Sequence, residues 1–367
     1  MAGYATKVKR DIARWVDEGL IEAPLGVRLS EDIERNGGSV VSFGTVLAMM
    51  AASLLAAAIL IFIASNWEAI PRIARVAMLF LAILAGYLGG AVLKLRGQNA
   101  FGEAAWIAGA AAFGGSISLI GQMYHLSGDE AQAVLVWTAC TGFAAIALRS
   151  GPLTVSAVLL AAGWMIMSAA EDWSATSLPL YYPLVAIALW AISFWTASVA
   201  ARHLVLLSLF LFALCLYVRN ESLDIAAVLA VLSAALFAWS KWYPQAAERL
   251  SGMGAGLTVH ALIGFLVAMS IFQWALVEED GFLAASIVTM AGIVAALILA
   301  GRDNAVLRWT AYVAFGFQLV FVYLVTVGTM LGTAGFFLVA SIALAVLAFL
   351  IMRVEKRFAG QSRRVAS

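Results

Sequence analysis

Long apolar runs alternate along this chain with short polar and charged segments. A helix that crosses ~30 Å of hydrocarbon needs roughly 20 mostly apolar residues. The runs near this length are residues 43–66, 74–93, 103–123, 131–148, 152–170, 180–200, 203–218, 224–240, 254–276, 281–300, 306–327 and 331–352. The pattern predicts an all-α fold: a polytopic transmembrane helical bundle of about twelve spans.

The loops between these runs are too short to fold alone, so one transmembrane domain is expected over residues 43–352. It follows a helical hairpin and hinge at residues 1–42 and precedes a basic tail at residues 353–367. Runs 203–218 and 224–240 are short, which leaves open whether both cross fully.

Residues 1–38 are expected to form two short helices in the cytoplasm. Ile12, Trp15 and Val16 have the spacing of one apolar helical face. Gly19 is expected to end the first helix, and Ser30 to begin the second. The hairpin would lie on the bilayer or the inner loops, or would bind a cytoplasmic protein partner.

Composition and charge support a membrane protein and give it a direction. Hydrophobic residues make up 64% of the chain and charged residues 12%, about half of what soluble domains usually carry. With the N-terminus inside, all of the 22 lysines and arginines except Arg72, Arg75 and Arg219 fall on the inner side. Both termini are therefore expected in the cytoplasm. The net charge of +1 gives no indication of nucleic-acid binding.

Few polar residues fall inside the predicted spans, and no Asp, Glu, Lys or Arg lies near a span centre. This argues against a carrier that couples to protons through a buried carboxylate. His260, Gln273 and Gln318 are expected to form hydrogen bonds between helices. Gly86 and Gly90 have the spacing of a close helix contact. Neither a metal-ligand pattern nor a cofactor motif is present, and no catalytic residue is assigned.

One constellation of polar and aromatic residues gathers at the predicted outer ends of the first four spans. An outer-face pocket formed by these residues would suit a lipid headgroup, a sugar or a small solute. The alternative is an ordinary interface, with aromatic anchors, a helix cap at Asn66 and an Arg75–Asp129 ion pair. A catalytic His125–Asp129 pair is the weakest interpretation. The candidate residues are Asn66, Trp67, Arg75, Gln122, Tyr124, His125, Asp129 and Trp137.

Three segments within this region carry a family resemblance: WVDEGLI at residues 15–21, ASNW with the following IP at 64–71, and GQMYHLSGD at 121–129. With Trp137, they make roughly residues 5–150 resemble the bacterial predicted-membrane-protein family called domain of unknown function 2157. Within the transmembrane domain, the resemblance covers residues 43–148. It implies a multi-pass bacterial inner-membrane protein. It implies no particular activity.

Three classes of function remain open. The first is transport or flipping of an uncharged or lipid-like substrate. The second is a non-enzymatic sensor or assembly component with a partner at residues 1–38. The third is an enzyme acting on envelope lipid or polymer at the outer face, which ranks last because the large outer loop or paired carboxylates expected of many such enzymes are missing. Membrane lipids are expected partners in every case.

Overall fold

The computed structural model describes residues 2–36, 70–125, 128–171, 178–279 and 281–326, together with isolated positions elsewhere. This part of the chain contains thirteen helices and no strand. It divides into two compact units, Met1–Arg75 and Val76–Ser367. The predicted boundary at residue 42, most of the predicted spans 43–66 and 331–352, and the tail at 353–367 lie outside the described residues.

The first unit contains a helical hairpin of α1 (Ala2–Asp17) and α2 (Ala23–Asn36). Gly19 takes a left-handed φ of 71° in the turn, as its lack of a Cβ permits. Ile12 is buried. Val16 packs closely on Gly26, because a Cβ added to Gly26 would lie 2.5 Å from the Val16 Cγ2. Trp15, predicted on the same face, is 37% exposed.

The expected start of the second helix at Ser30 is wrong. α2 begins one turn after α1 ends, with Pro24 near its start, where the missing N–H costs no hydrogen bond. Ser30 therefore lies in the interior of α2 and not at its start.

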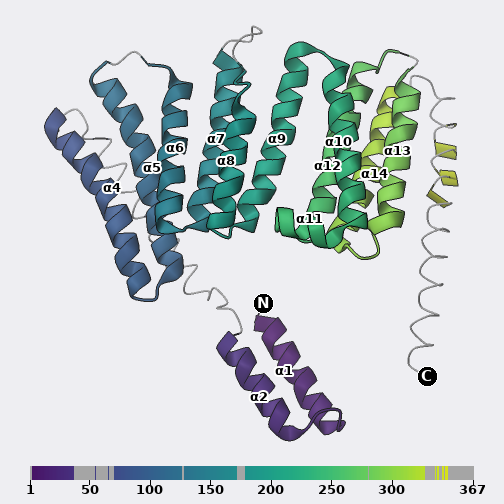
Figure 1. The fold of residues 1–367 in the computed structure, drawn as a ribbon, viewed down its shortest axis with the longest axis horizontal. Helices are drawn as coiled ribbons and strands as arrows, with labels where there is room; N and C mark the ends of the chain where they lie inside the picture. Colours follow the sequence, from purple (N-terminus) through teal and green to yellow (C-terminus); the bar gives the residue numbers. More distant parts are fainter. Residues whose placement is uncertain are drawn as a thin grey trace. The chain divides into compact units, whose positions relative to one another are not determined.

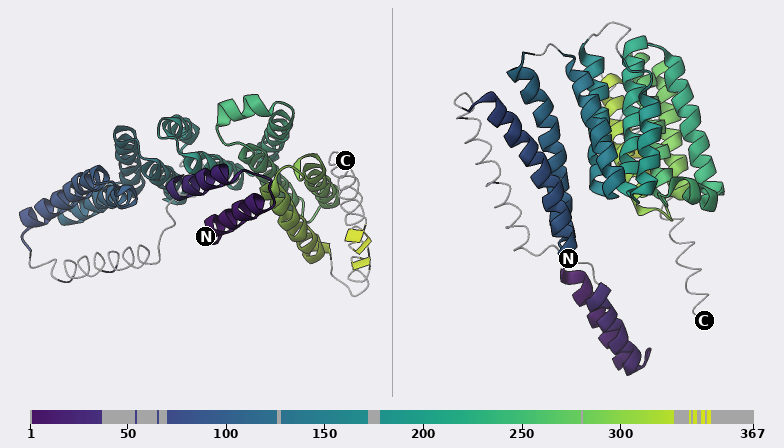
Figure 2. Two further views of the ribbon diagram at one scale, coloured as in Figure 1. Left: turned by 90° about the horizontal axis from the view of Figure 1, so that it is seen from below. Right: turned by 60° about the vertical axis from the view of Figure 1, so that its left-hand side comes forward.

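The second unit is a bundle of helices that run roughly parallel and antiparallel to one another (Figures 1 and 2). Nine helices in the described part are long and apolar enough to cross a membrane. They are α4 (Arg72–Leu95), α5 (Asn99–Met123), α6 (Glu130–Leu148), α7 (Gly151–Glu171), α9 (Val199–Asn220), α10 (Leu223–Trp242), α12 (Gly256–Ala275), α13 (Gly281–Ala300) and α14 (Ala305–Thr326). The protein is thus a polytopic helical membrane protein, and the count of twelve spans remains a prediction.

The predicted spans 203–218 and 224–240, which were expected to be short, are full-length helices in the structure. The short helix is the one that precedes them. α9 and α10 have 22 and 20 residues, whereas α8 (Tyr182–Trp195) has only 14 and extends about 21 Å. The cause is the turn at Thr196–Ser198. Ala197 takes a φ of 53°, and the Ser198 hydroxyl accepts a hydrogen bond from the Ala201 amide at 3.3 Å, so α9 starts before the predicted span 180–200 would end.

The core of the bundle lies along α12, which packs against α9, α10, α13 and α14. A second core joins α7, α8 and α9 around Trp164, Tyr182 and Val205. Large apolar side chains also face outward: Phe143 and Phe317 are more than 70% exposed. Outward-facing aromatic groups of this size fit a lipid environment.

The short helix α11 (Pro244–Ser251) was not predicted from the sequence. It lies crosswise at the end of α10 in Figure 1 and packs against that helix. Its Ala247 joins Met253 and Leu257 in a small apolar cluster against Trp239.

Candidate functional site

The predicted outer-face pocket can be followed only in part. Asn66 and Trp67 lie outside the described residues. Arg75 Nε donates a hydrogen bond to the Ile70 carbonyl oxygen at 2.7 Å, across the Pro71 corner that begins α4.

The other predicted residues stand at the end of α5 and the start of α6. Gln122, Tyr124 and His125 are exposed, and His125 takes a φ of 49° where α5 ends. The Asp129 carboxylate caps α6 by accepting a hydrogen bond from the Gln132 amide at 3.1 Å. Among the described residues, no hydrogen bond joins His125 to Asp129. Asp129 thus has a structural role, and a shared pocket for these residues remains a prediction.

Trp137, the last predicted member, points into the bundle. Its indole Nε1 donates to the Ala110 carbonyl oxygen of α5 at 2.8 Å. Its ring occupies the space that a Cβ on Gly114 would need. Trp137 therefore fixes the contact between α5 and α6.

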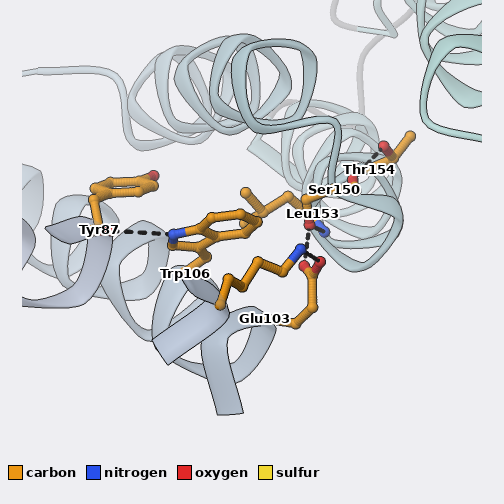
Figure 3. Close-up of polar contacts among 7 residues, drawn as sticks. Tyr87, Glu103, Trp106, Ser150, Leu153 and Thr154 are labelled. Atoms are coloured by element: carbon orange, nitrogen blue, oxygen red, sulfur yellow. Dashed lines mark hydrogen bonds and ion pairs between the residues drawn. The ribbon is translucent and has the colours of Figure 1, made fainter. Parts of the chain in front are cut away.

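A different polar group lies at the opposite ends of these helices. Glu103, near the start of α5, pairs with Lys94 at the end of α4 and accepts a hydrogen bond from the Ser150 hydroxyl (Figure 3). Ser150 is fully buried, while the Lys94 and Glu103 side chains are 27% and 21% exposed. We call Lys94, Glu103 and Ser150 the carboxylate cluster.

Two members of the carboxylate cluster, Lys94 and Ser150, have further support. Lys94 Nζ lies 4.2 Å from the ring centre of Trp106, a cation–π geometry, and Trp106 Nε1 donates to the Tyr87 carbonyl oxygen at 3.1 Å. The Ser150 hydroxyl also accepts from the Leu153 amide at 3.2 Å, which caps the start of α7. The cluster therefore ties together the ends of α4, α5 and α7.

The α4–α5 contact depends on glycine, as the spacing of Gly86 and Gly90 predicted. A Cβ on Gly86 would lie 2.5 Å from the Gly109 Cα, and one on Gly90 would collide with the Trp106 ring. Only glycine permits so close an approach. This prediction is confirmed.

The sequence alone shows Glu103 as an acid near one end of a predicted span and gives it no role. The turn at Gly97, with a φ of 78°, folds α5 back onto α4 and brings Lys94 to Glu103. That pairing could have been inferred from the short connection. Ser150, 47 residues further on, gave no comparable signal.

A second polar group lies inside the bundle, where α12, α13 and α14 meet. Gln318 Nε2 donates to Gln273 Oε1 at 2.8 Å, and Gln273 Nε2 donates to Thr289 Oγ1 at 2.6 Å. All three side chains are at least nine-tenths buried. We call Gln273, Thr289 and Gln318 the amide cluster. It confirms the predicted interhelical role of both glutamines, and Thr289 is the member that the sequence did not reveal.

His260 differs from that prediction. Its Nδ1 lies 2.9 Å from the Gly256 carbonyl oxygen of its own helix, and its contact with α9 is a stack on His203, with ring centres 4.8 Å apart. The neighbouring Arg202 is buried and donates to the Gly252 carbonyl oxygen at 2.5 Å. Its guanidinium also lies 4.2 Å from the Phe194 ring centre, so Arg202 holds the end of α11 against α8 and α9.

Polar contacts connect the turns at one end of the bundle. The carboxylate cluster joins the α4–α5 turn to α7, and Arg202 joins α9 to the α11–α12 turn. Lys241 pairs with Asp303 at 3.3 Å, and Asn304 Nδ2 donates to the Ala255 carbonyl oxygen at 2.8 Å. We call this the basic end, because Arg96, Arg149 and Arg249 also lie in or beside these turns.

The chemistry available to these groups is limited. The described residues contain no group of three or more His, Cys, Asp or Glu side chains that could hold a metal ion. Cys140 and Cys215 are free thiols. The polar atoms of the carboxylate cluster bind one another, and so do those of the amide cluster. Both clusters therefore have a structural role.

Comparison with known families agrees with the motifs in the first part of the chain. Residues 13–154 match the model of the family described as "Predicted membrane protein (DUF2157)". The resemblance inferred from residues 15–21, 64–71 and 121–129 is thereby confirmed. No curated protein and no solved structure gives a significant match to the chain.

The DUF2157 match and the bundle together make this a multi-pass membrane protein. The matched residues include the whole carboxylate cluster and the predicted outer-face residues. The amide cluster and the helices from α8 onward lie beyond the match.

Proposed function

We propose that this protein lies in a bacterial inner membrane with both termini in the cytoplasm, and that it moves or flips a lipid-like substrate. The orientation is supported by the basic end, because loops rich in lysine and arginine stay on the cytoplasmic side. The turns opposite contain acidic residues, including Asp129, Glu130 and Glu278.

The observation that carries the substrate class is a groove of about 340 Å³ between α9 and α10. Phe212 and Leu216 line one wall, and Val228 and Leu232 line the other. Val228 and Leu232 are about 60% exposed, so the groove opens on the side where lipid would lie. Among the described residues that line it, Asp224 alone is charged. Such a groove suits an acyl chain.

The amide cluster also favours a lipid-like substrate over a hydrophilic one. A path for a sugar or an ion needs polar atoms available to replace water. In the amide cluster, the side-chain donors and acceptors form hydrogen bonds between α12, α13 and α14. A substrate that keeps its apolar part in the groove would need no such path.

The test is a lipid-flipping assay on the full chain in proteoliposomes that contain a fluorescent phospholipid. Membrane-impermeant dithionite then bleaches label that reaches the outer leaflet. We expect faster bleaching than in protein-free vesicles. Val228→Trp, which fills the groove, should lower the rate by about tenfold, or roughly 1.4 kcal/mol of barrier.

The matched control is Val231→Trp, on the same helix and 68% exposed but outside the groove lining. It should leave the rate near that of the unmodified protein. Bleaching no faster than in protein-free vesicles would contradict the proposed function. If both variants lost the same share of the bleaching rate, the groove would have no part in flipping.

The hairpin favours a second candidate, a sensor or assembly component. Leu20, Leu25 and Val27 are 48–67% exposed on α1–α2 and its turn. Apolar side chains so exposed on a small hairpin suit a cytoplasmic partner or the bilayer surface. If a chain lacking residues 2–36 flips lipid normally but fails to complement a deletion strain, this role is supported. Full complementation would rule it out.

The enzyme alternative lacks comparable support. It needs His125 and Asp129 to face each other across an open cleft, whereas the Asp129 carboxylate caps α6. It therefore stays behind both other candidates.

A further inference from the structure

The corner where α10 turns into α11 presents aromatic, apolar and cationic groups together at the basic end. A hollow of about 660 Å³ there is lined by Trp242, Tyr243, Gln245, Arg249 and Leu250, with Pro244 and Ala246 between them. Trp242, Tyr243 and Leu250 are 64–75% exposed. We call this hollow the α10–α11 corner.

The corner has a fixed position relative to the spans. Trp242 is the last residue of α10, and α12 begins at Gly256, so the corner lies at the level where two spans leave the hydrocarbon. Trp and Tyr side chains favour this level, with their rings among the headgroups. A short helix lying across span ends with exposed Leu250 has the character of an interfacial helix.

α11 is held firmly to the bundle. Ala247 and Ser251 are buried on its inner side, and Arg202 binds the carbonyl oxygen that follows the helix at Gly252. The exposed side chains thus belong to a supported surface and do not result from a loose segment. The described part of the bundle leaves them open to a partner.

The charge of the lining selects that partner. Among the described residues, Arg249 is the only charged one that lines the corner, and it forms no ion pair with any of them. The nearest acid on the same helix, Glu248, is turned toward Gly254, and Lys241 is already paired with Asp303. Trp242, Tyr243 and Gln245 add neutral hydrogen-bond donors.

We propose that the α10–α11 corner binds the headgroup of an anionic phospholipid. The guanidinium of Arg249 engages the phosphate, since its planar fork matches phosphate geometry. The rings of Trp242 and Tyr243 lie against the glycerol region, and Leu250 contacts the upper acyl chain. The site is separate from the α9–α10 groove, and the proposal does not depend on lipid flipping.

The experiment titrates the full chain in neutral detergent with phosphatidylglycerol or phosphatidylcholine and follows thermal unfolding. We expect phosphatidylglycerol to act at about fivefold lower concentration, the factor for one arginine near an anionic lipid. Arg249→Gln should abolish this preference, while Arg249→Lys, which keeps the charge but loses the planar fork, should keep only part of it. Arg96→Gln removes a charge from another turn of the basic end and should keep the preference in full.

Three results would overturn the proposal. The first is an equal response to both lipids in the unmodified protein. The second is an equal loss in the Arg249→Gln and Arg96→Gln variants, which would indicate unspecific attraction to the basic end. The third is an equal stabilisation by inorganic phosphate alone, which would make the site one for a free anion. If Arg249→Gln does not fold, the two lipids and Arg249→Lys still decide the question.

Discussion

The carboxylate cluster and the amide cluster each join three helices, but they use different chemistry. The amide cluster is neutral, and every side chain in it is at least nine-tenths buried. The carboxylate cluster contains an ion pair whose side chains remain 21–27% exposed at the helix ends. Removing a charge from water is far more costly than burying a paired amide. In these two clusters, exposure to water thus matches the kind of polar contact that joins the helices.

The strongest way to break this comparison is to place a charge in the amide cluster. Gln318→Lys would bury an ammonium among groups that offer no carboxylate, and we expect a loss of about 3 kcal/mol in the free energy of unfolding. Reversible unfolding in mixed detergent micelles measures it. Gln122→Lys, at the exposed end of α5, is the control and should change stability by less than about 0.5 kcal/mol.

If the Gln318→Lys and Gln122→Lys variants unfold alike, burial at Gln318 does not exclude charge. The amide cluster would then be accessible to water. That result would also reopen a hydrophilic path between α12 and α14.

A smaller effect is expected from Gln273→Leu. The substitution deprives Gln318 of its partner, while Thr289 keeps its hydrogen bond to the Ala285 carbonyl oxygen at 2.8 Å. We expect a loss of about 1–2 kcal/mol in the free energy of unfolding. The double variant Gln273→Leu/Gln318→Leu should cost less than the sum of its single changes, because no amide is then left unpaired. Strict additivity would show that the two amides act independently.

The sequence predicted the parts of this fold that depend on local pattern. Apolar runs located the helices, the Gly86–Gly90 spacing located the α4–α5 contact, and the isolation of Gln273 and Gln318 pointed to interhelical hydrogen bonds. In each case a single helix carries the signal, because a polar group or a small residue within an apolar run needs a partner.

The remaining features depend on contacts between distant segments or on single turns. The Ser198 cap shortens α8, yet one serine within an apolar stretch did not outweigh the hydropathy of residues 180–200. α11 is too short and too polar for a search based on spans. The contact of Glu103 with Ser150 joins residues that are distant in the sequence, and only the fold brings them together. The outer-face pocket was inferred from shared topology, which places helix ends on one side but does not determine which side chains meet.

The carboxylate cluster should show the smallest effect. Glu103→Gln keeps an oxygen that can accept from the Ser150 hydroxyl but removes the charge that pairs with Lys94. Because both side chains are partly exposed and Lys94 also faces the Trp106 ring, we expect a loss below about 1 kcal/mol in the free energy of unfolding. Unfolding at low ionic strength measures it.

Salt then separates the two clusters more sharply than the size of the loss. Raising ionic strength toward 1 M shortens the screening length to about 3 Å. The stability difference between the unmodified protein and Glu103→Gln should shrink, since the lost interaction is one between charges within reach of solvent. The difference for Gln273→Leu should stay constant, since its lost interaction is neutral and buried. If salt changed both differences alike, the contrast between a charged end and a neutral interior would fail. If it changed neither, the Lys94–Glu103 pair would be as shielded from water as the amides.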